Sequence, residues 1–224
     1  MVNVLVLPLL SMSEAPPSHP RSQRWQRAFL LGAFVILTAF IAWKVSGAAL
    51  QRSPENRLRS MAPRVGASAL NIPWDPAVHD RDLIRGDGDA RPFRIAQLGD
   101  RTLFVNFWAT WCEPCVRELP SMLSLARSLP PDRFAMVSIS YDEDWQTVES
   151  FFRKHLGRVP PELNVVLDPT PESDPLKKRY GTEKLPETYI VQGGVIRHKF
   201  VNAHDWEDRA KREYFHLLLS SAGD

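Results

Sequence analysis

A long apolar stretch near the amino terminus is the strongest pattern along the chain. Residues 28–43 carry no charged side chain over sixteen positions, and the apolar pattern continues beyond Lys44. Because about 20 helical residues cross a ~30 Å hydrocarbon core, the pattern predicts a transmembrane anchor over residues 28–50. Trp25 and Trp43 would lie at interfacial depth, and Lys44 could extend toward the headgroups.

The flanks of this stretch indicate its orientation. Arg21, Arg24 and Arg27 precede it, so the positive-inside rule predicts residues 1–27 as a cytoplasmic segment and the rest of the chain as exported. A cleaved signal peptide is the alternative, because small residues follow the apolar run at 46–49.

Beyond the anchor, short apolar segments alternate with helical patterns. Residues 51–64 are polar and interrupted by proline, which predicts a linker before a single domain over 65–224. Residues 66–99 predict extended segments and a small hairpin. Strands are predicted at 103–108, 134–139, 164–167, 188–191 and 195–201, and helices from the cysteines to 129 with a kink at Pro120, at 145–155, at 175–180 and at 206–219. The alternation predicts an α/β architecture with a mixed central β-sheet flanked by helices.

The two cysteines of the chain lie at the start of one of these helices. Cys112 and Cys115 follow the strand predicted at 103–108 almost directly. Backbone N–H groups and the helix dipole favour a thiolate at a helix N-terminus, so Cys112 is the predicted nucleophile. Residues three apart share a helix face, so the two sulfurs can form a disulfide with little backbone movement.

Other roles for the cysteine pair have less support in the sequence. A disulfide that closes a loop of about four residues removes only ~2 kcal/mol of unfolded-state entropy, which makes a poor structural crosslink. Structural zinc needs four ligands, and the chain has no second cysteine pair. A copper metallochaperone that holds Cu(I) on Cys112 and Cys115 stays open as an alternative function, and it would need one of the six histidines beside the thiols.

Charge narrows the possible partners. The net charge is +2, and four of the 28 Lys and Arg residues precede residue 52 whereas only one of the 26 acidic residues does. The sequence has no basic patch of the kind that would predict nucleic-acid binding.

The cysteine segment resembles a known family. The signal is the run Asn106-Phe107-Trp108-Ala109-Thr110-Trp111-Cys112-Glu113-Pro114-Cys115, followed by Glu118-Leu119-Pro120, with later landmarks in order at 167–169, 180–181, 185–188, 193–194 and 205–206. From about Arg101 to the carboxyl end, the chain resembles the membrane-anchored bacterial TlpA/ResA-like and CcmG-like thiol-disulfide oxidoreductases. This resemblance implies a thioredoxin-like fold preceded by one transmembrane helix.

The resemblance implies roles for several residues. Cys112 would be the attacking thiol and Cys115 the buried thiol that resolves the mixed disulfide. Pro186 matches the family's cis-proline, which lies against the disulfide and leaves the backbone of Leu185 free to pair with an extended substrate peptide. Trp111, Leu185 and Pro186 are therefore the predicted substrate-binding residues, and Trp108 and Trp111 would shield the thiols.

Glu118 matches an acidic residue that the ResA-like group keeps near its cysteines. It could accept the proton of Cys115 if burial raises its pKa toward neutrality, and the open alternative is a solvated helix residue. Asn106 stands where thioredoxin itself has a buried aspartate, so this acid–base role is either moved to Glu118 or absent. Glu113, between the cysteines, is expected to raise the pKa of Cys112 and to favour a reductant.

The implied function is reduction of disulfides in exported proteins, with the haem-binding cysteines of apocytochrome c as substrate. The enzyme would be a single-pass inner-membrane protein facing the periplasm, with no cofactor besides its cysteine pair. A membrane electron donor of the DsbD or CcdA kind would re-reduce it, because an oxidising compartment has no thioredoxin reductase. Oxidation of substrates by the same fold stays open.

Overall fold

The computed structural model describes residues 21–51, 53–85, 92–169 and 174–221. It divides into two compact units, residues 1–50 and 51–224. Most of the predicted cytoplasmic segment, residues 1–20, lies outside the described residues.

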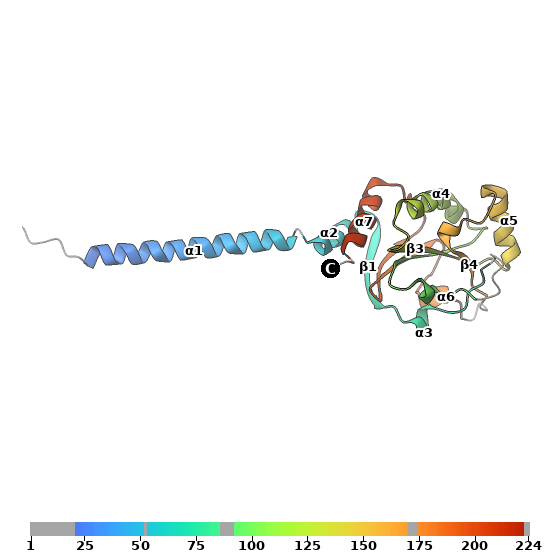
Figure 1. Ribbon diagram of the computed structural model, residues 1–224, viewed down its shortest axis with the longest axis horizontal. Helices are drawn as coiled ribbons and strands as arrows, with labels where there is room; N and C mark the ends of the chain where they lie inside the picture. The colour runs from blue at the N-terminus through green and yellow to red at the C-terminus, as the bar shows by residue number, and fades with distance from the viewer. Residues whose placement is uncertain (1–20, 52, 86–91, 170–173, 222–224) are drawn as a thin grey trace, which may run out of the picture. The chain divides into compact units, whose positions relative to one another are not determined.

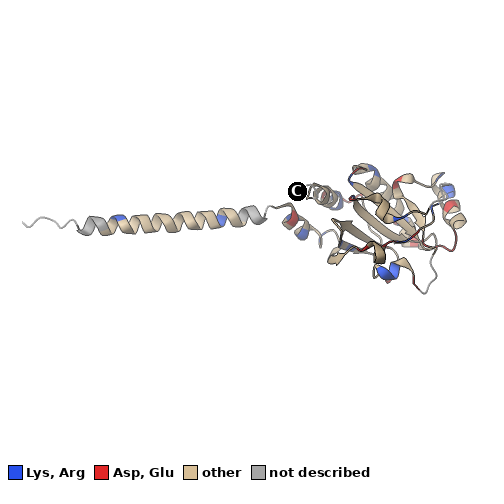
Figure 2. Cartoon of the chain, turned by 60° about the horizontal axis from the view of Figure 1, so that its bottom comes forward, with Lys and Arg blue, Asp and Glu red and all other residues tan. Residues whose placement is uncertain are grey.

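The first unit contains one long helix. Helix α1 spans Arg21–Gln51, and its segment Trp25–Gly47 has a mean hydropathy of 2.1 with no burial inside the protein. Figure 2 shows that charged residues are sparse along this helix. Among the described residues, α1 is the one helix with the length and composition to cross a membrane. Its position near the amino terminus also suits a signal sequence, so both interpretations of the apolar run stay open.

The second unit is built on a six-stranded mixed sheet (Figure 1). The strands are β1 Ala67–Pro73, β2 Thr102–Trp108, β3 Phe134–Ser140, β4 Val165–Leu167, β5 Glu187–Gln192 and β6 Val195–Val201, in the spatial order β1-β6-β5-β2-β3-β4. Strands β2, β3 and β4 run parallel, whereas β5 is antiparallel to β2 and β6, and β6 is antiparallel to β1. The predicted strands and the mixed sheet are confirmed.

Helices and helical turns connect and cover the strands. They are α2 Pro54–Met61, α3 Pro76–His79, α4 Glu113–Ser128, α5 Trp145–Leu156, α6 Leu176–Arg179 and α7 Arg209–Ser220, with 3-10 turns η1 Ile95–Leu98 and η2 Pro161–Leu163. Helix α4 continues through Pro120. The predicted helices after the cysteines and at 145–155 and 175–180 are confirmed to within a few residues.

The central strand β2 is buried on both faces, which explains its unbroken apolar run. Phe104 and Trp108 on one face pack in a core with residues of α4, α5 and α7. Leu103, Val105 and Phe107 on the other face pack in a second core with residues of α6 and of the segment before β2. This burial fixes where β2 ends, and therefore where the cysteine segment begins.

The prediction of a linker at 51–64 is wrong for its central part. Residues 54–61 form α2, whose first turn is capped by the Ser53 hydroxyl accepting the Asn56 N–H at 3.3 Å. Leu58 is buried in the same core as α7, and Arg57 pairs with Glu213 at 3.3 Å. The apolar residues of the segment, Leu58, Met61 and Ala62, are too few to predict a stable helix by themselves, and docking on α7 stabilises this one.

Residues 66–99 combine predicted and unpredicted features. Strand β1 is extended as expected, and an antiparallel bridge joins Leu83 to Phe93; residues 86–91 lie outside the described residues. Helix α3 and turn η1 were not predicted. Asp80 stabilises η1, because its carboxylate accepts the Ile95 N–H at 2.9 Å and the Ala96 N–H at 3.1 Å.

The start of the last helix also differs from the prediction. Helix α7 begins at Arg209 rather than at 206, because the Asp208 carboxylate accepts the N–H groups of Ala210 and Lys211 as an N-cap. Trp206 lies before the helix and is fully buried.

The docking of α2 can be tested by removing its buried side chain. Leu58→Ala should lower the free energy of unfolding of the second unit by about 2–3 kcal/mol, because truncation of a buried leucine leaves a cavity. Arg59→Ala, which breaks an exposed pair with Glu55 in the same helix, should change it by less than about 1 kcal/mol. Urea unfolding of the full chain in detergent micelles measures both, and equal effects would show that α2 is an undocked linker.

Candidate active site

The two cysteines form a disulfide at the start of α4. Cys112 is the N-cap residue, and its Sγ is bonded to the Sγ of Cys115, with the two Cα atoms 5.3 Å apart. The backbone N–H of Cys115 points at Cys112 Sγ at 3.4 Å. Cys112 keeps 6% of its surface exposed, whereas Cys115 keeps none. Within this oxidised pair, Cys112 is thus the sulfur nearer to solvent and to helix-end N–H groups.

A buried carboxylate that the sequence analysis missed anchors the segment before Cys112. Asp142 accepts the backbone N–H of Thr110 at 3.0 Å and the Thr110 hydroxyl at 2.6 Å. The Ser140 hydroxyl donates to the same carboxylate at 2.5 Å, and the Tyr141 N–H bonds the Trp108 carbonyl at 2.9 Å. The end of β3 therefore holds the end of β2 and the approach to the disulfide.

A signal for Asp142 was present in the sequence. The residue follows the strand predicted at 134–139 within a few positions, and the cysteines follow the strand at 103–108 in the same way. Carboxyl ends of adjacent parallel strands meet at one edge of a sheet, where sites of α/β proteins lie. A polar residue directly after a buried parallel strand was therefore a candidate for the functional site.

Glu118 lies on the buried face of α4, three residues after Cys115. It is 3% exposed, which rules out the alternative of a solvated helix residue. Its Oε2 accepts the His204 backbone N–H at 3.0 Å and the Trp206 Nε1–H at 3.2 Å. Desolvation by burial outweighs these hydrogen bonds and raises the pKa of Glu118 to about 7. Near neutral pH the side chain can therefore take up or release a proton.

Asn106 on β2 holds the other carboxylate oxygen. Its Nδ2 donates to Glu118 Oε1 at 3.1 Å and to Thr188 Oγ1 at 3.0 Å. The amide is fully buried between the helix and β5. Asn106, at the position matched to the buried acid of thioredoxin, thus donates a hydrogen bond to Glu118 on α4.

The Leu185–Pro186 peptide bond is cis, as the resemblance implied. Pro186 is buried and Leu185 is half-buried. The Pro186 carbonyl accepts the Asn202 N–H at 3.1 Å, which connects this turn to the end of β6. Their part in substrate binding stays a prediction.

Glu187, directly after the cis-proline, is a second buried acid that the sequence analysis missed. Its Oε2 lies 2.7 Å from Lys199 Nζ and accepts the Tyr189 hydroxyl at 3.0 Å. Lys199 also donates to the Gly181 carbonyl at 2.9 Å. The pair fixes the first residue of β5 and the turn before it.

The two tryptophans beside the cysteines have different surroundings. Trp108 is fully buried, with its ring 5.4 Å from that of Phe152. Trp111 is 69% exposed and adjoins Cys112 in the chain. Trp111 is therefore free to contact a partner, whereas Trp108 is a core residue. Glu113 is ion-paired with Arg117 at 2.5 Å on the exposed side of α4.

The described residues provide no group of ligands that would hold a metal ion at the cysteine pair. Among residues 21–51, 53–85, 92–169 and 174–221, no three His, Cys, Asp or Glu side chains are grouped so that they could hold a metal ion. The Cu(I) alternative therefore rests on the two cysteines alone.

Comparisons with known proteins agree with the fold and the cysteine pair. A family model described as thioredoxin-like matches residues 99–195. The thiol-disulfide oxidoreductase ResA of Geobacillus thermodenitrificans is 29% identical over 110 residues, 49% of this chain and 59% of that protein. The thiol:disulfide interchange protein DsbE-2 of Pasteurella multocida is 28% identical over 179 residues, 80% of this chain and 82% of that protein.

A solved structure supports the same fold. The crystal structure of a DsbE thiol:disulfide interchange protein from Chlorobium tepidum has a TM-score of 0.53 at 20% identity, covering 66% of this chain and 96% of that chain. The predicted thioredoxin-like fold is confirmed. The chain spans about three fifths of the length of the ResA relative.

The raised pKa of Glu118 predicts a pH-dependent stability. The folded protein keeps this proton up to about pH 7, whereas an unfolded glutamate releases it near 4.5. The folded state therefore binds more protons in this window, and its stability falls by about 3 kcal/mol as pH rises from 4.5 to above 7. In Glu118→Gln this contribution should vanish.

Urea unfolding of the oxidised full chain at several pH values measures the effect as the difference between wild type and Glu118→Gln. Glu113→Gln, at an exposed position of the same helix, is the matched control and should keep the wild-type slope. A Glu118→Gln profile parallel to the wild type would show that Glu118 ionises normally in the folded protein.

Proposed function

We propose that this chain is a membrane-tethered thiol-disulfide oxidoreductase that reduces disulfides of exported proteins. The observation that carries the proposal is the Cys112–Cys115 disulfide at the N-terminus of α4, on the same helix as a buried glutamate whose pKa is about 7. The names of the ResA and DsbE relatives support thiol-disulfide exchange as the reaction.

In the first step, the reduced enzyme attacks with Cys112. Its position as N-cap, with the Cys115 N–H directed at its sulfur, favours the thiolate. The thiolate displaces one sulfur of the substrate disulfide, and a mixed disulfide forms between Cys112 and the substrate. Trp111 and the cis-Pro186 turn would hold the substrate strand during this step.

In the second step, Cys115 resolves the mixed disulfide. Its thiol must lose a proton before it attacks Cys112 Sγ, and Cys115 has no exposed surface from which water could take that proton. Glu118 is the nearby base on the helix, and a pKa close to the working pH suits it to accept the proton and return it. The substrate leaves with two thiols, and the two electrons it gained come from the thiols of Cys112 and Cys115, which are oxidised to the disulfide.

The cycle needs an electron donor. In an oxidising compartment a membrane thiol carrier of the DsbD or CcdA kind would re-reduce Cys112 and Cys115 by the same exchange in reverse. The apolar helix α1 would keep the enzyme at the membrane, with the second unit in the periplasm. The haem-binding cysteines of apocytochrome c are the proposed substrate.

Single-cysteine variants test the reaction. With a peptide that carries a disulfide within a Cys-x-x-Cys-His sequence, Cys115→Ser should accumulate a mixed disulfide on Cys112, because the resolving thiol is absent. Cys112→Ser is the matched control and should form little adduct, since Cys115 has no exposed surface. Non-reducing electrophoresis and mass spectrometry detect the adduct. Equal trapping by both variants, or by neither, contradicts the assigned roles.

The direction of the reaction is measured on the wild type. A reductant should have a reduction potential near about −270 mV, whereas a value near about −120 mV would indicate an oxidase.

The orientation is tested by labelling in spheroplasts. After mild reduction, a membrane-impermeant maleimide should label Cys112 in intact spheroplasts if the second unit faces the periplasm. A control chain with Ser18→Cys and both native cysteines changed to Ser should be labelled only after lysis. Labelling of Cys112 only after lysis contradicts the proposed location, and a mature mass short by about fifty residues would identify α1 as a cleaved signal.

A further inference from the structure

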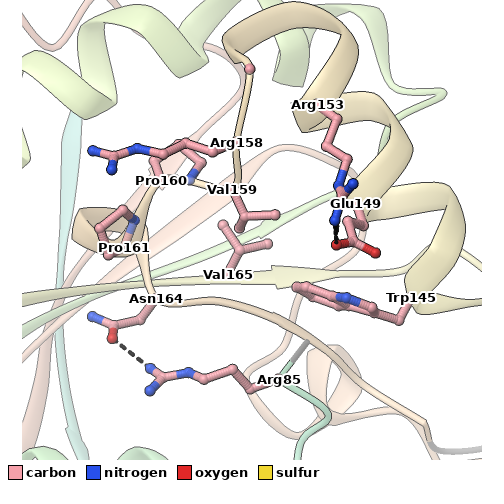
Figure 3. A pocket seen from close by; sticks show the side chains of 11 residues that line it. Arg85, Trp145, Glu149, Arg153, Arg158, Val159, Pro160, Pro161, Asn164 and Val165 are labelled. Atoms are coloured by element: carbon pink, nitrogen blue, oxygen red, sulfur yellow. Dashed lines mark hydrogen bonds and ion pairs between the residues drawn. The ribbon is translucent and has the colours of Figure 1, made fainter. Parts of the chain in front are cut away.

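A cavity of about 400 Å³ opens beside α5 (Figure 3). Residues of α5 form one wall, and the segment from Gly157 to Val165 forms the other. None of its lining residues is a cysteine or one of the residues that bind Glu118 or Asp142. Its volume is within the range of sites for small organic molecules.

The walls of the cavity are apolar over much of their area. Val159 and Val165 project from one wall toward the indole of Trp145, and Pro160 and Pro161 lie behind the valines (Figure 3). A slot between branched aliphatic groups and an aromatic ring suits a flat apolar group, which can stack on the indole.

The charged groups around this slot are mainly cationic. The lining holds the guanidinium groups of Arg85, Arg153 and Arg158 and the single carboxylate of Glu149. That carboxylate is already paired with Arg153 at 2.8 Å. Arg85 donates to Asn164 Oδ1 at 2.6 Å from the lower side of the cavity, and the Arg158 side chain runs above Pro160, on the side away from Trp145 (Figure 3). The excess positive charge favours an anion.

The cavity wall also holds an unused hydrogen-bond donor. Trp145 Nε1 is buried and has no hydrogen-bond partner among the residues that the structure describes. Leaving a buried N–H unpaired is costly, and an oxygen atom of a bound molecule would satisfy it.

We propose that this cavity binds a small organic oxyanion with a flat apolar body. The body fills the slot between Trp145 and the two valines, an oxygen accepts the Trp145 N–H, and the guanidinium groups neutralise the charge. Such a site is independent of the disulfide reaction, so the protein can bind the anion in either redox state of Cys112 and Cys115.

The test uses 2-naphthoate as the probe and the full chain in detergent micelles. With the tryptophan indoles labelled with ¹⁵N, the Nε1–H resonance of Trp145, assigned with Trp145→Phe, should shift saturably as 2-naphthoate is added. The neutral amide 2-naphthamide, which has the same ring system, should bind about tenfold more weakly, because it lacks the charge that the guanidinium groups pair with.

Matched variants separate the cavity from general binding to protein or micelle. Arg153→Ala should weaken 2-naphthoate binding about tenfold, because it removes a guanidinium group and leaves the Glu149 carboxylate without its partner, whereas Arg209→Ala, at the start of α7, should leave the binding unchanged. Val159→Phe should abolish the shift by filling the slot, and Val159 is half-buried, so the fold should tolerate the change. No saturable shift in the wild type, or equal affinity for the acid and the amide, would overturn the proposal.

Discussion

The burial of the Glu118 carboxylate is the constraint on which the arrangement of the disulfide site depends. A buried carboxylate is costly unless it receives hydrogen bonds, and here its three donors come from two segments that are far apart in the chain. Asn106 belongs to β2, whereas the His204 N–H and the Trp206 indole belong to the loop after β6. Satisfying one side chain therefore fixes the spacing of the central strand, the cysteine helix and that loop. The donors are too few to keep the group fully ionised at neutral pH, and this leaves it able to exchange a proton.

The disulfide itself is held from the other side by the sheet. Asp142, at the end of β3, binds the backbone and hydroxyl of Thr110 just before Cys112. The cis-proline turn is held by the Asn202 N–H and by the buried pair of Glu187 and Lys199. These contacts fix the segment before Cys112 and the cis-proline turn, and Trp111 lies exposed next to Cys112. Preorganised surroundings of this kind let the reacting sulfurs exchange partners with little rearrangement of the chain.

Much of the fold could be predicted from local pattern. The run at 103–108 is apolar at nearly every position because β2 packs two cores, and the period of 3.6 in the segment after the cysteines matches the buried face of α4. Prediction failed where a single contact decides the structure. Leu58 makes residues 54–61 helical only because α7 offers a partner, and Asp208 delays the start of α7 by accepting two N–H groups.

The sequence by itself determined the chemistry that the site could contain: one cysteine pair at the start of a helix, a glutamate one turn later and a proline that matches the family's cis position. Only the tertiary structure decided the state of these groups. The pKa of Glu118 depends on its burial and on hydrogen bonds from residues up to 88 positions away, and the placement of Cys112 depends on an aspartate 30 positions later. Burial and hydrogen bonding are sums over neighbours in space, and a linear pattern records only neighbours along the chain.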